Sequence, residues 1–445
     1  MLNFAQYLQS NISAGRLILQ GDNRYEAARR VWNGTTDRHP IAIVQAKDVD
    51  DIRKAILAAT GAKVPLAVRG GGHSLPGLST CDGGVVVGLS GLNAIEIDPV
   101  SRRAMVSGGA LLGDLDKAGS TFGLVVPAGV VSHTGAGGLT LGGGMGWLSR
   151  RFGLTIDSLL QIDLITADGQ LISASAESEP ELFWGLRGGG GNFGIAVKFH
   201  FRMHELGPVM TGTWDYDLKD SRAALRRLAE LAHLAPRELT TAFNLTKTNL
   251  RVSAFCSGLE DLGGSLVESF GELAGSSNGT FGPAVFTTFQ SRSDEHACWG
   301  RRYYAKGGYF AGLTDPIVEC MKEATTSSPT PDSEIYVIQL GGAVSDVDDA
   351  DTAYTGRAAQ FYWIVQPIWD DPKDDVACMK WGRQTASQMT AFSMAGNYVN
   401  EQADFGSELA MDAYGNTKYR RLQKLKARFD PGNVFRLNQN IIPQE

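Results

Sequence analysis

The sequence predicts an α+β fold in two parts, and two observations support this prediction. Over residues 24–203, short strand-like segments and helices follow one another irregularly, unlike the regular alternation of a doubly wound sheet. From residue 209 to about residue 390, longer strands alternate with amphipathic helices. The composition shifts near Leu206-Gly207-Pro208, which we take as a boundary. The expected segments are a first domain over 1–206, a second over 207–390, and a closing segment over 391–445.

Capping and turn residues define the elements of the first part. Asp48 is a helix N-cap followed by apolar residues on one face, with Gly61 at the end of that helix. Gly123 ends another helix, and Asp168-Gly169 is typical of a hairpin turn. The expected helices are 24–33, 49–61, 111–122 and 179–186, and the expected strands are 65–68, 85–89, 94–98, 103–107, 195–203 and the hairpin 161–174.

The second part should form one sheet with helices on one face and a ligand on the other. The expected helices are 218–234, 259–273 and 316–324, and the expected strands are 240–245, 251–256, 335–340 and 361–366. In the closing segment a basic helix over 418–429 should end at Asp430-Pro431-Gly432.

Composition excludes several classes of function. A net charge of −7 argues against nucleic acid as a partner. No apolar run approaches the ~20 residues of a membrane span, and the N-terminus lacks the basic start and apolar core of a signal peptide. The cysteines are odd in number and form no C-x-x-C pair, so we expect reduced thiols, no metal site and a cytoplasmic location. They are Cys81, Cys256, Cys298, Cys320 and Cys378.

Glycine is concentrated in three runs, within residues 65–77, 127–146 and 187–196, each beside a strand-like segment. A loop without Cβ atoms lets backbone N–H groups approach an anion such as a pyrophosphate. The first run is neither a G-x-G-x-x-G dinucleotide fingerprint nor a P-loop, and by itself could be a turn with a surface histidine. One extended dinucleotide would explain all three runs.

Four motifs in this order carry a resemblance to a known family. They are Arg69-Gly-Gly-Gly-His-Ser74, Gly137-Gly-Leu-Thr-Leu-Gly-Gly-Gly-Met-Gly146, Gly191-Asn-Phe-Gly-Ile195 and Asp430-Pro-Gly-Asn-Val-Phe435. With them the sequence resembles the vanillyl-alcohol-oxidase flavoproteins, and within these the berberine-bridge-enzyme-like branch. The resemblance implies a two-domain PCMH-type FAD-binding fold. Its substrate domain would be an inserted antiparallel sheet covered by helices, and the tail would return to the FAD domain.

The resemblance also implies a set of FAD-binding residues, matched position by position. They are Arg69, Gly70, Gly71, Gly72, His73, Ser74, Gly77, Val131, Thr134, Gly135, Gly137, Gly138, Thr140, Gly143, Gly144, Gly146, Gly194, Ile195, Asn400, Asn438 and Asn440.

Within this set, the resemblance implies individual roles. The histidine after the first glycine loop, here His73, is bonded covalently to the flavin in the family. Many members carry a second attachment through a cysteine where this chain has Val131, so we expect attachment through His73 only. Thr134 stands where the family controls access of O₂, which favours an oxidase; alternatively, its hydroxyl only hydrogen-bonds a loop carbonyl. His133 is either a hydrogen-bonded structural residue or a ligand-facing one.

The catalytic base is expected on the strand 361–366 or in the tail. Tyr362, Ile364 and Gln366 share one face of the strand, and that face lacks the carboxylate that the branch often has there. Glu401 stands where plant members have a tyrosine that is a candidate base. A desolvated glutamate can remove a proton, although Glu401 could equally be a solvated surface residue.

Further candidates surround these positions. Tyr398 is included among the catalytic candidates with Glu401 and Tyr362, although Tyr398 and Asn400 could instead contact the flavin or support the loop. Tyr336 and Tyr354 are additional pocket candidates.

The implied function is an FAD-dependent oxidase. A hydride would pass from the carbon of an alcohol, sugar hydroxyl or amine to covalent flavin, and O₂ would reoxidise the flavin to give H₂O₂. The alternatives are a flavin dehydrogenase or reductase with another electron acceptor, and a catalytically silent flavin-binding protein. The partners would be a small-molecule substrate and O₂, without nucleic acid or membrane, and the sequence leaves the oligomeric state open.

Overall fold

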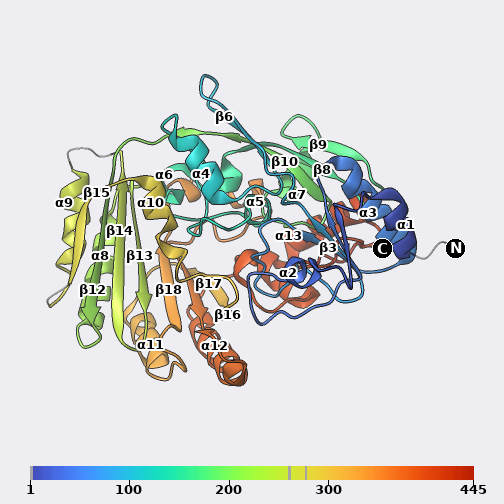
Figure 1. Cartoon of the computed structure of the whole chain (residues 1–445). Helices are drawn as coiled ribbons and strands as arrows, with labels where there is room; N and C mark the ends of the chain where they lie inside the picture. The colour runs from blue at the N-terminus through green and yellow to red at the C-terminus, as the bar shows by residue number, and fades with distance from the viewer. Residues whose placement is uncertain (1–3, 259–261, 276–277, 445) are drawn as a thin grey trace.

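A four-stranded, a five-stranded and a seven-stranded sheet form the framework of this computed structural model, which describes residues 4–258, 262–275 and 278–444 (Figure 1). The seven-stranded sheet occupies one half of the molecule, and the two smaller sheets and both chain ends occupy the other. The predicted α+β class is confirmed, because helices cover the five- and seven-stranded sheets, which are antiparallel, and the parallel strands among the described residues are confined to the four-stranded sheet.

The four-stranded sheet carries the first glycine run at one end of a strand. Its order is β1 (Leu17–Leu19), β2 (Ala42–Gln45), β4 (Val85–Gly88) and β3 (Leu66–Arg69), with β2, β4 and β3 parallel and β1 antiparallel. Helices α1 (Phe4–Asn11) and α3 (Val49–Ala62) share a core with it, and α2 (Tyr25–Arg29) lies nearby. Asp48 caps α3 as expected by accepting from the N–H of Asp51 at 2.9 Å. The helix extends beyond Gly61, and Lys63 takes the left-handed conformation that ends it.

The five-stranded sheet is antiparallel throughout, in the order β5 (Ile95–Asp98), β6 (Arg103–Ser107), β10 (Ile195–Arg202), β8 (Leu159–Ile165) and β9 (Leu171–Ser175). The predicted hairpin is confirmed, and Gly169 in its turn has a φ of 82°. One hydrophobic core joins this sheet to α4 (Leu112–Ser120), α5 (Ala136–Gly142), α7 (Pro180–Leu186) and the C-terminal α13 (Ser407–Phe429).

The seven-stranded sheet is also antiparallel, and its two faces differ. Its order is β15 (Asn278–Ala284), β12 (Val209–Asp217), β14 (Asn249–Ser257), β13 (Leu239–Leu245), β18 (Glu334–Gln339), β19 (Phe361–Gln366) and β17 (Lys306–Phe310). Alternate residues such as Val252, Val337 and Trp363 pack under α8 (Ser221–Leu234), α9 (Gly263–Glu268), α11 (Asp315–Thr326) and α12 (Asp375–Thr390). Their neighbours Arg251, Tyr336 and Ile364 point the other way, as the period of two predicts.

The tail is bound to the third glycine run by a buried ion pair. Lys426 Nζ lies 2.7 Å from the Asp430 carboxylate, and both side chains are completely buried. The same ammonium donates to the backbone oxygens of Asn192 and Phe435, each at 2.8 Å. A buried ammonium needs such complete pairing, so this cluster fixes the tail against residues 187–196.

The observed elements agree with most of the expected ones and add several. Strand 361–366 has the expected limits, whereas the expected helix 418–429 is the second part of α13, which bends at Gly415. Of the expected helix 259–273, residues 259–261 lie outside the described residues, and the rest contains α9 and a short 3₁₀ turn. The elements that were not expected include α1, β12, β15, β17, α10 (Phe286–Gln290) and α12.

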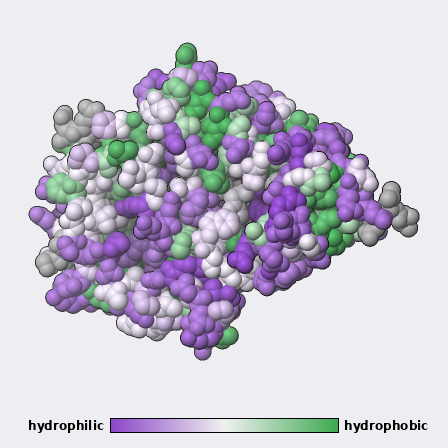
Figure 2. Space-filling model, in the orientation of Figure 1, coloured by the Kyte–Doolittle hydropathy of each residue, from purple (hydrophilic) through white to green (hydrophobic). Residues whose placement is uncertain are grey.

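The visible surface is mainly hydrophilic, with hydrophobic residues scattered over it (Figure 2). None of the helices in the described part of the chain combines the length and the apolar character that crossing a bilayer requires.

A buried carboxyl on α4 should make the stability of this fold depend on pH. Burial raises the pKa of Asp116 to about 7, and Gln290 lowers it in part. This folded-state pKa exceeds the unfolded value of about 3.9. The free energy of unfolding is therefore highest below about pH 3.9 and declines as the pH rises to 7, by up to about 4 kcal/mol. Asp116→Asn should therefore be more stable than wild type at pH 8 and similar to it at pH 4. Urea unfolding at the two pH values measures the difference; equal stabilities at pH 8 would contradict it.

Candidate active site

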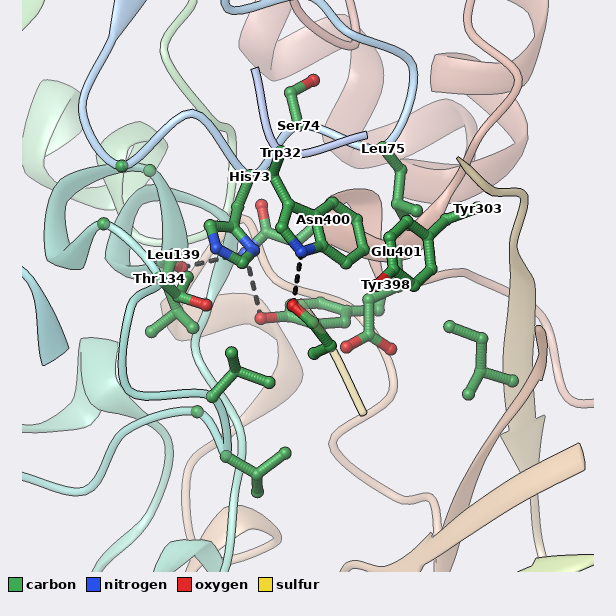
Figure 3. Close-up of a pocket in the computed structure, with 18 of the residues that line it drawn as sticks. Trp32, His73, Ser74, Leu75, Thr134, Leu139, Tyr303, Tyr398, Asn400 and Glu401 are labelled. Carbon is green, nitrogen blue, oxygen red and sulfur yellow. Dashed lines mark hydrogen bonds between the residues drawn. The ribbon is translucent and has the colours of Figure 1, made fainter. Parts of the chain in front are cut away.

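A cavity of about 890 Å³ lies between the glycine runs and the uncovered face of the seven-stranded sheet. This volume is at the upper end of the roughly 300–1,000 Å³ of small-molecule sites. Trp32, His73, Tyr303, Tyr398 and Glu401 surround one region of it, and they come from segments far apart in the sequence (Figure 3).

Two of the glycine runs meet backbone to backbone beside this cavity. A Cβ on Gly71 would lie 2.2 Å from the nitrogen of Gly135, and a Cβ on Gly135 would lie 2.2 Å from the nitrogen of Gly71. Real Cβ atoms do not approach this closely, so both positions require glycine. The contact brings the loop after β3 against the loop before α5.

His73 stands at this contact with one ring nitrogen occupied. Its Nε2 lies 2.6 Å from Nδ1 of His133, which leaves the Nδ1 of His73 outside the contact. The ring of Trp32 stacks on His73 with centroids 4.8 Å apart, and on Tyr303 with centroids 3.9 Å apart. Burial, together with His133, lowers the pKa of His73 to about 3. The imidazole is therefore neutral at physiological pH and able to act as a nucleophile.

The tail supports the second glycine run through Tyr398 and Asn400. The Tyr398 hydroxyl accepts from the N–H of Gly144 at 3.1 Å and from Asn400 Nδ2 at 2.9 Å. The same Asn400 nitrogen donates to the oxygen of Leu139 at 2.9 Å. These bonds fix the orientation of the segment that carries Glu401.

Glu401 reaches the cavity in an environment that favours its protonated form. Burial raises the pKa of its carboxyl to about 7, and the Tyr362 hydroxyl lowers it in part. Burial, and next the Glu401 carboxylate, raise the pKa values of Tyr362 and Tyr398 well above that of a free tyrosine. At neutral pH, therefore, Glu401 can accept a proton and the two tyrosines cannot.

Most of the expected residues lie together, and several do not. The expected residues that line the cavity are Gly70, Gly71, Gly72, His73, Ser74, Val131, Thr134, Gly135, Gly137, Gly138, Gly194, Ile195, Tyr398, Asn400, Glu401 and Asn438. Those outside its lining are Arg69, Gly77, Thr140, Gly143, Gly144, Gly146, Tyr362 and Asn440. The Thr140 hydroxyl donates to the oxygen of Ala136, one helical turn back, so it faces its own helix. Tyr362 is almost fully buried behind the wall.

The remaining candidates and the additional residues belong mainly to the sheet. Tyr336 lines the cavity, whereas Tyr354 and His133 do not. The sequence interpretation did not identify Trp32, Tyr303, Asn244, Arg251, Arg292, His296 and Glu334, all of which line the cavity. Asn244 and Arg251 could have been found from the alternation of side chains along a strand, because each lies on an expected strand at a position facing away from the helices. Trp32, Arg292 and Tyr303 carry no such local signal.

The residues present fit an FAD molecule. Gly138 and Gly191 line the cavity, and a Cβ on either would meet no described atom within 4 Å, so side chains there would fill ligand space. Exposed backbone of this kind suits a pyrophosphate. Asn438 also lines the cavity, and its buried side-chain oxygen has no hydrogen-bond partner among the described residues.

Comparison with known proteins agrees with this fit. A family model described as "FAD binding domain" matches residues 40–175, and one described as "Berberine and berberine like" matches residues 397–442. An FAD-linked oxidoreductase of Dictyostelium discoideum is 31% identical over 434 residues, which cover 96% of this chain and 95% of the relative.

Solved structures show the same fold. Wild-type BBE-like 1 of Physcomitrella patens matches with a TM-score of 0.91 over 100% of both chains, at 23% identity. Glucooligosaccharide oxidase of Acremonium strictum, described as carrying a 6-S-cysteinyl, 8α-N1-histidyl FAD, matches with a TM-score of 0.87 over 99% of each chain, at 22% identity. These likenesses agree with the fold implied by the four motifs.

The contact between the glycine loops should be essential for cofactor binding. Gly71→Ala places a methyl group 2.2 Å from a backbone nitrogen, so the two loops must separate. We expect purified Gly71→Ala to carry less FAD per chain and to melt at a lower temperature. Gly61→Ala in α3 is the control, because its Cβ would meet no described atom within 4 Å. Wild-type FAD content in Gly71→Ala would mean that the contact is dispensable.

Proposed function

The chain belongs to the berberine-bridge-enzyme-like FAD-linked oxidoreductases, and from this premise we propose that it is an oxidase with Glu401 as its base and its FAD attached through His73 alone. The observation that carries the proposal is a carboxyl on the cavity wall whose pKa is raised to about 7. A base is most effective when its pKa lies near the working pH.

The reaction divides between the cofactor and this carboxyl. Bound FAD would accept a hydride, a proton with two electrons, from a substrate C–H bond and pass the two electrons to O₂, which with two protons gives H₂O₂. The Glu401 carboxylate would take the proton from the neighbouring O–H or N–H group of an alcohol, a sugar or an amine. Tyr362, behind the wall, would support the charged form of Glu401.

Single attachment through His73 is supported by its surroundings. Its imidazole is neutral, and the His133 contact occupies Nε2, so Nδ1 is the nitrogen available for a covalent bond. Val131 lines the cavity at the position where many family members carry a second, cysteine attachment, and its side chain has no nucleophile. Stacking on Trp32 would restrain the ring for this bond.

Two further assignments are part of the proposal. Thr134 lines the cavity, as access of O₂ at this position would require.

The proposed division into 1–206, 207–390 and 391–445 is supported by the seven-stranded sheet, whose strands all lie between Val209 and Gln366.

Covalent attachment through His73 should be visible after denaturation. Acid-precipitated wild-type protein should stay yellow, and peptide mapping should find one flavin adduct, on the His73 peptide. His73→Ala should release all its FAD on precipitation. His133→Phe removes the contact to Nε2 but keeps an aromatic ring, so flavin incorporation should be slower during reconstitution with FAD. A flavin–cysteine adduct on any peptide, or free flavin from wild type, would refute single attachment.

The base assignment predicts a specific pH profile. Because the folded-state pKa of Glu401 is about 7, anaerobic flavin reduction should slow as pH falls below 7, where the carboxylate becomes protonated. Glu401→Gln should keep covalent flavin, reduce it roughly 10²- to 10⁴-fold more slowly, and lose this acidic limb. A substrate screen in air with peroxide detection identifies the substrate, and stopped-flow absorbance then measures the reduction.

Tyr362→Phe is the matched control for Glu401→Gln. The Tyr362 hydroxyl lowers the pKa of Glu401, so its loss should shift the acidic limb to higher pH while reduction at high pH persists. If Tyr362→Phe abolishes reduction at every pH and Glu401→Gln does not, the base is Tyr362 instead.

A further inference from the structure

The charged residues on the sheet side of the cavity are almost all neutralised by partners. Arg251 forms a two-pronged ion pair with Asp215, at 2.9 and 3.0 Å. His296 lies 3.6 Å from Glu334, which also accepts from Asn244 at 2.8 Å. Asp332, the other acid on this wall, is 2.7 Å from Arg301. These groups therefore offer a ligand little uncompensated charge.

Arg292 is the exception on this wall. Its guanidinium lies over the ring of Phe289 at 3.9 Å and over Trp147 at 4.8 Å, and its NH1 donates to Thr213 Oγ1 at 2.9 Å. Arg251 and Arg301 have acidic partners at 2.9 and 2.7 Å, whereas Arg292 forms no ion pair with any described residue. Burial lowers the pKa of Arg292 to about 10, so it is still a cation at neutral pH. A guanidinium has five N–H donors in a planar fork that matches a carboxylate, and most of them remain available here.

Tyr336 connects this cation with the proposed base. Its ring lines the cavity, and the charges of both Arg292 and Glu401 act on its hydroxyl. The hydroxyl oxygen is buried and has no hydrogen-bond partner among the described residues. One ligand could therefore contact Arg292 and Tyr336 at one end and Glu401 at the other.

The cofactor does not account for this cation. Gly138 and Gly191, which suit the pyrophosphate, belong to the glycine runs, whereas the guanidinium of Arg292 donates to Thr213 of β12 on the seven-stranded sheet. The segment that carries Arg292 reaches the second glycine run through its neighbours Gln290 and Asp294, which form hydrogen bonds with Gly129 and Ser132. A cation that is partly desolvated without a counter-charge is costly, and an anionic ligand would remove that cost. Trp147 and Phe289 keep the guanidinium in place by stacking on it.

We propose that the substrate is a carboxylic acid, held by its carboxylate on Arg292 and Tyr336, with its oxidisable hydroxyl or amine at Glu401. This inference rests on the proposed function, since it names the substrate class of the same site. A hydroxy acid, an amino acid or an acidic sugar has the required pair of groups. The neutral alcohol, amide or sugar of the same shape lacks the group that pairs with Arg292.

Ligand binding tests the proposal without turnover. Holoenzyme is titrated anaerobically with acetate, benzoate and glucuronate, and with acetamide, benzamide and glucose as their neutral counterparts, while the flavin absorption spectrum is recorded. We expect at least one acid to bind roughly 10- to 100-fold more tightly than its neutral counterpart. Arg292→Met should abolish that preference, and Arg292→Lys should retain part of it. Arg251→Met is the control on the same wall and should keep the preference, because Asp215 already neutralises Arg251.

The outcomes separate this inference from the proposed oxidase. If no acid binds more tightly than its neutral counterpart, or if Arg292→Met keeps the preference, the carboxylate site is refuted. A covalent flavin content and a melting temperature equal to those of wild type exclude a folding defect in each variant. If acids bind as expected but no compound yields H₂O₂ in air, the oxidase proposal fails while the carboxylate site stands.

Discussion

The backbone contact between Gly71 and Gly135 is the constraint on which the rest of the site depends. Each residue fills the space that a Cβ on the other would need, so the two loops meet at a fixed separation. This separation brings His73 within 2.6 Å of His133, although the two lie 60 positions apart in the chain. Three residues after Gly135, the backbone of Gly138 is open to the cavity. One close approach therefore positions a neutral nucleophile beside a surface that suits a pyrophosphate.

Burial gives the ionisable groups around the cavity different charges at one pH. It lowers the pKa of His73 to about 3, so this ring is neutral. It raises the pKa of Glu401 to about 7, so this carboxyl is partly charged. It lowers the pKa of Arg292 only to about 10, so this guanidinium is a full cation. Burial thus gives a neutral ring and a proton acceptor in one cavity, and it is too weak an effect to remove the charge of Arg292.

The sequence predicted what depends on local pattern and missed what depends on long-range contact. Glycine runs, the hairpin at Asp168-Gly169 and the strand 361–366 have signatures within a few residues, and the structure contains each of them. The cofactor set included Thr140, whose hydroxyl instead closes its own helix, because a matched position does not fix a side-chain direction. Trp32 and Tyr303 stack although they are far apart in the chain. Such a pair has no local signature, and the unpaired state of Arg292 likewise follows only from its surroundings.

The proposed base and the residues proposed to bind the substrate carboxylate come from different parts of the chain. Glu401 is carried by the tail. That segment is attached to the second glycine run because the Tyr398 hydroxyl accepts from the N–H of Gly144 and Asn400 donates to the oxygen of Leu139. Tyr336 belongs to β18 of the seven-stranded sheet, and Arg292 lies in the 3₁₀ turn Ser291–Ser293 and donates to Thr213 of that sheet. A change at Arg292 or Tyr336 can therefore alter the ligand that binds while the hydrogen bonds between the tail and the second glycine run stay in place. Substrate preference can accordingly change at Arg292 and Tyr336 while Glu401 and its support from Tyr362 are kept.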